Sequence, residues 1–138
     1  MIAMVEGAGK SLRILYIEDN DQNYYLVHFI LGAKGHEVRR ARDGMEGISL
    51  ATAVKPDLIL LDIQLPVMDG YAIARELQKK PELAKTPIIA LTSYAMAGDR
   101  EKALAAGCTG YIEKPINPKT FMLQIEQYLQ PSTQGENK

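Results

Sequence analysis

The feature that most constrains the fold is a regular alternation of short apolar runs with longer segments of helical periodicity. The apolar runs have the length and composition of β-strands and cover residues 12–17, 36–41, 58–61, 88–91 and 111–113. The helical segments cover residues 21–33, 43–54, about 70–79, 99–106 and about 117–129. Strands that alternate with helices at this spacing are joined by crossovers, so the sheet is parallel and helices cover both of its faces. The pattern predicts a (βα)5 three-layer α/β sandwich.

Residues that favour helix ends support these boundaries. Gly35 is placed to end the first helix, and Asp43 is an N-cap for the second. Pro56 prevents that second helix from continuing. Asn117 is the expected N-cap of the last helix, with Pro118 in its first turn.

The character of each apolar run predicts the order of the strands. Residues 36–41 alternate between apolar and polar, which is typical of an edge strand, whereas residues 58–61 are continuously apolar, as in a strand covered on both faces. Right-handed crossovers leave few arrangements, of which the flavodoxin-like order 2-1-3-4-5 is the common one for five strands. We therefore expect that order.

Composition limits the class of protein. The 138 residues suit one domain, which we place at residues 12–130 between tails at 1–11 and 131–138. Sixteen Lys and Arg against 17 Asp and Glu give a net charge of -1, which argues against nucleic-acid binding. The single Cys108 excludes an internal disulfide framework. We find no signal peptide and no membrane span, so we expect a cytoplasmic protein, as a monomer or weak dimer.

Charged and hydroxyl residues follow the predicted strands at one edge of the sheet. Glu18 and Asp19 follow the first strand, Asp62 the third, Thr92 the fourth and Lys114 the fifth. In the expected order, the first and third strands are neighbours at the point where ligands bind. Three carboxylates in one crevice repel one another, so either a pKa rises or a cation binds between them. Oxygen donors without nearby His or Cys favour Mg²⁺.

The same crevice suits phosphoryl transfer. Lys114 supplies a positive charge and Thr92 a hydroxyl donor, which together with the metal could neutralise the oxygens of a phosphoryl group. Asp62 lies centrally and is the natural nucleophile, because a carboxylate can form an aspartyl phosphate.

Taken together, these residues resemble the receiver domain of two-component response regulators. The resemblance covers roughly residues 12–129. Its motifs are Glu18-Asp19-Asn20, residues 57–70 with Asp62, Pro66, Asp69 and Gly70, then Thr92-Ser93 and Lys114-Pro115. Residues 95–99 and 114–116 are similar to single-domain receivers of the chemotaxis and cell-cycle kind.

The resemblance implies a role for each metal and phosphate ligand. Asp62 would be the phosphoacceptor and would receive its phosphoryl group from the phosphohistidine of a histidine kinase or histidine phosphotransfer protein. Asp19 would bind Mg²⁺ directly, Glu18 through water, and Gln64 through its backbone carbonyl. The first acid is Glu18, where the family more often has Asp.

The resemblance also implies a switch. Thr92 and Lys114 would grip the phosphoryl group and draw their loops inward, and Tyr111 stands where the family has its aromatic switch residue. Tyr111 could equally be an inward-facing core residue. Gln64 and Tyr94 occupy positions whose side chains modulate water access in the family.

Three other functions remain as alternatives. The leading interpretation is a stand-alone switch that catalyses only its own phosphorylation and dephosphorylation and acts on a downstream protein target. The chain could instead be a receiver segment of a hybrid histidine kinase. An aspartyl-phosphate phosphatase would typically carry a second Asp where Gln64 stands. A phosphorylation-independent interaction module would usually lack the acidic residues.

The first helix carries two apolar groups. Leu26, Val27, Ile30 and Leu31 are expected to face the sheet. Tyr25, His28 and Phe29 form a second cluster on another face, which we interpret as a contact site for the phosphoryl donor. The helix at 99–106 has few large apolar residues, so we expect it to be loosely held and to move on phosphorylation.

Overall fold

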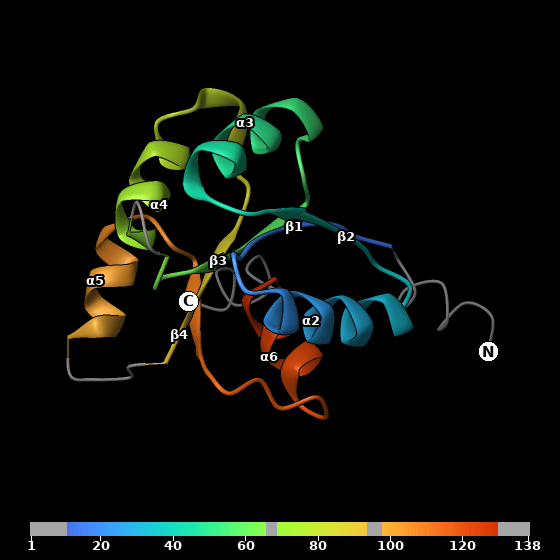
Figure 1. The fold of residues 1–138 in the computed structure, drawn as a ribbon. Helices are drawn as coiled ribbons and strands as arrows, with labels where there is room; N and C mark the ends of the chain where they lie inside the picture. Colours follow the sequence, from blue (N-terminus) through green and yellow to red (C-terminus); the bar gives the residue numbers. More distant parts are fainter. Residues whose placement is uncertain (1–10, 66–68, 94–97, 130–138) are drawn as a thin grey trace, which may run out of the picture.

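Five parallel strands form the centre of the molecule, with helices on both faces (Figure 1). The computed structural model describes residues 11–65, 69–93 and 98–129. The strands are β1 (Arg13–Ile17), β2 (Glu37–Ala41), β3 (Leu58–Asp62), β4 (Ile88–Thr92) and β5 (Gly110–Glu113). The helices are α2 (Asp21–Ala33), α3 (Gly44–Val54), α4 (Gly70–Gln78), α5 (Asp99–Ala105) and α6 (Phe121–Tyr128), with a 3-10 turn at Pro81–Leu83.

The strand order is β2-β1-β3-β4-β5, which confirms the predicted flavodoxin-like topology. Every residue of β3 and β4 is buried, because both faces of these central strands are covered. In contrast, the edge strand β2 buries only Val38 and Ala41 fully. The continuous and the alternating apolar patterns therefore correspond to central and edge positions, as expected.

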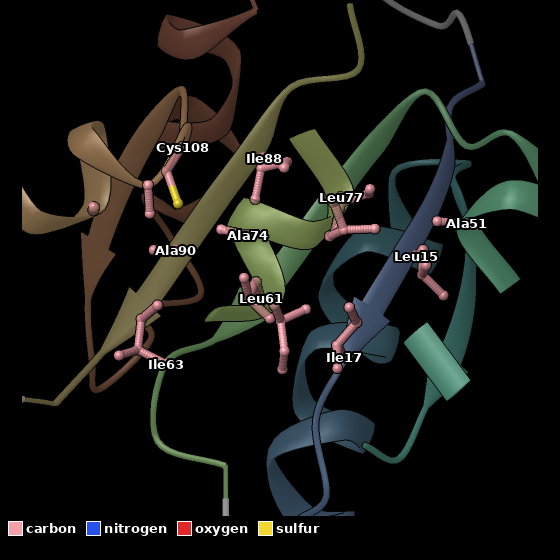
Figure 2. Packing of buried hydrophobic residues seen from close by; sticks show 14 of the residues in the cluster. Leu15, Ile17, Ala51, Leu61, Ile63, Ala74, Leu77, Ile88, Ala90 and Cys108 are labelled. Carbon is pink, nitrogen blue, oxygen red and sulfur yellow. The ribbon is translucent and has the colours of Figure 1, made fainter. Parts of the chain in front are cut away.

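Two layers of core side chains separate the sheet from its helices. Helices α2 and α6 cover one face, and α3, α4 and α5 cover the other (Figure 1). The layer beneath α3, α4 and α5 contains Leu61 and Ile63 together with Ala74 and Leu77 of α4 (Figure 2). Cys108 also lies in this layer, 5% exposed, and burial raises the pKa of its thiol to about 11. Cys108 is thus a packing residue.

Carboxylate and amide side chains begin the first three helices. Asn20, Asp43 and Asp69 each accept a hydrogen bond from the backbone N–H three residues further along. Such caps satisfy amide groups that have no partner within the helix. At the other end of α2, Gly35 has a φ of +89°, a conformation that glycine adopts without strain.

The sequence-based boundary of the last helix is wrong by three residues. Helix α6 begins at Phe121, because residues 118–120 form a turn. Asn117 begins that turn, where its side chain accepts the Lys119 N–H at 2.9 Å and its carbonyl accepts the Phe121 N–H. Asn117 is therefore not the N-cap of α6. That position is Thr120, whose side chain makes no capping hydrogen bond, and the hydrogen bonds of Asn117 lie one turn earlier.

The predicted sheet-facing stripe of α2 is also partly wrong. Val27, Ile30 and Leu31 are buried, but Leu26 is 39% exposed. Half-buried Tyr24 takes its place and packs against the same core. Tyr24 lies three residues before Val27 and so continues its stripe, whereas Leu26 is rotated by about 100° from Val27.

Some predictions fall outside the described residues. These are the tails, apart from Ser11, and also Pro66, Tyr94 and the segment 95–97. Within the part of the chain that is described, none of the helices combines the length and apolar character needed to cross a membrane.

Candidate functional site

The carboxyl ends of the parallel strands bring the predicted site residues to one edge of the sheet. Asp62 and Thr92 are the last residues of β3 and β4. Glu18 and Lys114 directly follow β1 and β5, and their N–H groups extend the strand pairing to Ala41 and Thr92 at 2.9 and 2.7 Å. The backbone of each residue is therefore fixed by the sheet.

Three carboxylates gather at this edge. Glu18, Asp19 and Asp62 each offer an oxygen, and these oxygens lie within 4.8 Å of one another. Glu18 is fully buried and Asp62 is 3% exposed, whereas Asp19 is open to solvent. The structure therefore confirms the prediction that these three acids lie close together.

Lys114 lies against the two buried acids. Its Nζ is 3.2 Å from Asp62 Oδ1 and 3.8 Å from Glu18 Oε1. One ammonium group cannot balance three carboxylates. Burial, and then the charge of Asp62, raises the pKa of Glu18 to about 7 from an ordinary value of 4.5. The site therefore carries an excess of negative charge that a cation would relieve.

The donor set fits a hard divalent cation. The clustered side chains offer carboxylate oxygens, the ligands that Mg²⁺ prefers. Both Glu18 oxygens already have protein donors, since Oε1 accepts from the Tyr16 hydroxyl at 2.8 Å and Oε2 from the Asn20 N–H at 3.2 Å. This arrangement suits a contact through water from Glu18 and leaves Asp19 and Asp62 as candidates for direct contact.

Gln64 connects the ends of β3 and β4. Its N–H donates to Asp62 Oδ1 at 3.0 Å, and its side chain accepts from the Ser93 N–H at 3.3 Å. The side-chain amide also donates to Thr92 Oγ1 over a long 3.5 Å. Gln64 therefore lies in the crevice as predicted, while the assignment of its backbone carbonyl as a metal ligand stays a prediction.

Tyr111 is half-buried on β5, against the core layer beneath α3, α4 and α5. Its carbonyl accepts the Tyr128 hydroxyl at 3.1 Å, which ties β5 to α6. This half-buried position agrees with the second interpretation of Tyr111, as a residue that faces the core. Its role as a switch residue stays a prediction.

Sequence reasoning missed two residues that hold Glu18. The Tyr16 hydroxyl binds its carboxylate, and the Arg40 Nε donates to its carbonyl at 3.0 Å. The first was detectable, because residues 16 and 18 of a strand point to the same face. The second was not, because nothing local relates Arg40 on β2 to the end of β1.

The acidic crevice with its lysine lies at the carboxyl edge of a 2-1-3-4-5 sheet, at the topological switch point where α/β proteins of this class bind their ligands. Comparison with known proteins gives the family. Residues 14–126 match the response regulator receiver domain model, and the chain belongs to that family. It is thus a receiver domain of two-component signalling, and such domains interact with histidine kinases and downstream targets.

Similar proteins include two polar-differentiation response regulators called DivK, from Brucella anthropi and Brucella ovis. Each is 41% identical to this chain over 116 residues, which is 84% of this chain and 94% of the relative.

Solved structures of receiver proteins have the same fold. The chemotaxis protein CheY4 of Vibrio cholerae has a TM-score of 0.82 at 28% identity, covering 86% of this chain and 99% of that one. The receiver domain of the sensor histidine kinase PA1611 from Pseudomonas aeruginosa has a TM-score of 0.79 at 34% identity, covering 87% and 98%. That structure holds a magnesium ion coordinated in its active-site cleft. Receiver domains as a family bind Mg²⁺ at an acidic site.

Proposed function

We propose that this receiver accepts a phosphoryl group on Asp62 from the phosphohistidine of a histidine kinase or phosphotransfer protein, with Mg²⁺, and thereby changes its contacts with a downstream protein. The observation that carries the proposal is the setting of Asp62. Its carboxylate is almost buried, is 3.2 Å from the Lys114 ammonium, and lies in a cluster with two further acids. We place the reaction in the cytoplasm, where such donors occur.

The chain's own residues supply most of the chemistry. A carboxylate oxygen of Asp62 attacks phosphorus while the bond from phosphorus to the donor's imidazole nitrogen breaks. Lys114, already in contact with Asp62, balances the negative charge that the phosphoryl oxygens bring. Mg²⁺, held by Asp19, Asp62, the Gln64 carbonyl and, through water, Glu18, would supply further positive charge to those oxygens.

The switch would begin at Thr92. Its hydroxyl now lies against the Gln64 amide, and a phosphoryl group on Asp62 would offer it a stronger acceptor. Movement of Thr92 toward the phosphoryl group would let Tyr111 follow. The next helix, α5, has seven residues, of which only Ala103 is buried, so little apolar packing opposes a shift. Amide-exchange changes over residues 98–106 on adding a phosphoryl mimic would support this, and unchanged exchange there would contradict it.

The donor would dock on α2. Tyr25 and Phe29 are 63% and 74% exposed, and the neighbouring His28 is exposed as well, so this cluster is not part of the core. Phe29→Ser should slow transfer from a cognate protein donor and leave labelling by a small-molecule phosphodonor unchanged. Equal slowing with both donors would show that the substitution acts on the site itself.

The test of the main proposal is incubation with a small-molecule phosphodonor, with and without Mg²⁺, followed by intact-mass measurement. Wild type should gain one phosphate only with the metal, and Asp62→Asn should gain none. Asp57→Asn is the matched control, because Asp57 is an exposed acid at the opposite end of β3. Rapid turnover of the donor would favour a phosphatase, and absence of labelling would favour a phosphorylation-independent module.

A further inference from the structure

We propose that Tyr16 is a positioning residue of the site, whose hydroxyl fixes the Glu18 carboxylate for the metal. The inference rests on the proposed Mg²⁺ site and extends it to a residue outside the cluster of acids. Tyr16 lies on β1 and is 1% exposed, and its hydroxyl donates to Glu18 Oε1 at 2.8 Å. Both groups of this hydrogen bond are buried, so water does not compete for either partner.

The ring of Tyr16 is itself held in place. It stacks on Tyr24 of α2, with ring centroids 6.2 Å apart and an angle of 26° between the planes. The Arg40 guanidinium lies over the Tyr24 ring at 5.0 Å from its centroid. The hydroxyl therefore has a fixed position from which to orient Glu18.

Arg40 holds the rest of Glu18. Its Nε donates to the Glu18 carbonyl at 3.0 Å, and its Nη1 pairs with Asp21 at 2.7 Å. The stack of Arg40, Tyr24 and Tyr16 thus fixes both the backbone and the carboxylate of one residue. A flexible glutamate that is ordered before the ion arrives loses less entropy on binding, and the affinity rises.

The length of the glutamate side chain makes this pairing specific. An aspartate at position 18 would carry its carboxylate one carbon closer to the backbone and would not reach the hydroxyl in the same way. Tyr16 and Glu18 should therefore act as a unit, and removing either member should remove the contribution of both. A tyrosine that acted only through packing would show no such dependence on residue 18.

The experiment is a double-mutant cycle on Mg²⁺ affinity, measured by isothermal titration calorimetry. Tyr16→Phe should raise the Kd for Mg²⁺ about 10-fold, the lower end of the effect of losing a residue that orients the groups around a metal ion. In a Glu18→Asp background the same change should leave the Kd within about 2-fold. Tyr128→Phe is the matched control, because its hydroxyl donates to the Tyr111 carbonyl at 3.1 Å, not to an acid.

A second measurement needs no metal. Three-bond NMR couplings should show one rotamer of the Glu18 side chain in wild type and in Tyr128→Phe, and averaged rotamers in Tyr16→Phe. Unchanged couplings in Tyr16→Phe would overturn the inference, as would equal effects on the Kd in both backgrounds. If wild type bound no Mg²⁺ although its couplings behaved as expected, the proposed metal site would fail while the role of Tyr16 in fixing Glu18 would stand.

Discussion

Replacing Gly70 with alanine should damage both the stability and the site. Gly70 is the first residue of α4, and a Cβ there would lie 2.5 Å from the Ile63 Cα and 3.0 Å from the Asp62 carbonyl oxygen. Carbon atoms pack at about 3.5–4.0 Å, so α4 and the end of β3 must separate by about 1 Å. Because the obstruction is backbone, rotation of a side chain cannot relieve it.

The size of the effect follows from two opposing contributions. Overpacking costs about 1–3 kcal/mol, and alanine recovers up to about 1 kcal/mol of helix propensity relative to glycine. The free energy of unfolding should fall by about 1–2 kcal/mol, which lowers the melting temperature by roughly 4–8 °C. Asp62 moves with Ile63, so phosphoryl labelling should slow on the order of 10- to 100-fold.

Urea unfolding and intact-mass labelling measure the two effects. Gly32→Ala is the control, because Gly32 lies in α2 and a Cβ there meets no atom within 4 Å. That substitution should stabilise the protein by about 0.5–1 kcal/mol and leave labelling unchanged. If Gly70→Ala were as stable as wild type and labelled at the same rate, the close approach of α4 to β3 would not be a constraint.

Three further predictions concern single residues. Glu18 has a pKa of about 7 when folded, above its ordinary 4.5, so its contribution to the free energy of unfolding falls as pH rises through that interval. In urea unfolding without metal, the stability of Glu18→Gln should therefore depend less on pH in this interval than that of wild type. An equal pH dependence of the two proteins would contradict this. Asp43→Ala removes the side chain that accepts the Glu46 N–H, so its free energy of unfolding should fall by about 1 kcal/mol. Asp43→Asn keeps an acceptor, so its free energy of unfolding should fall by less. Cys108, buried and with a pKa raised to about 11, should react with iodoacetamide quickly only in denaturant; rapid labelling of folded protein would refute its burial.

The sequence by itself determined the order of the strands and the edge at which the site lies. Apolar runs and helical periodicity are local patterns, and the handedness of crossovers converts them into one topology. Because a residue at the end of a parallel strand must lie at the carboxyl edge, Glu18, Asp62 and Thr92 could be placed together before any contact was known.

What only the tertiary structure decided is how side chains from different elements meet. The exposure of Leu26 depends on which face of α2 the sheet accepts, and local propensity does not set it. The Arg40 contact with the Glu18 carbonyl and the Gln64 bridge to Ser93 each join two separate elements. Such contacts are fixed by packing in three dimensions, and sequence spacing carries no record of them.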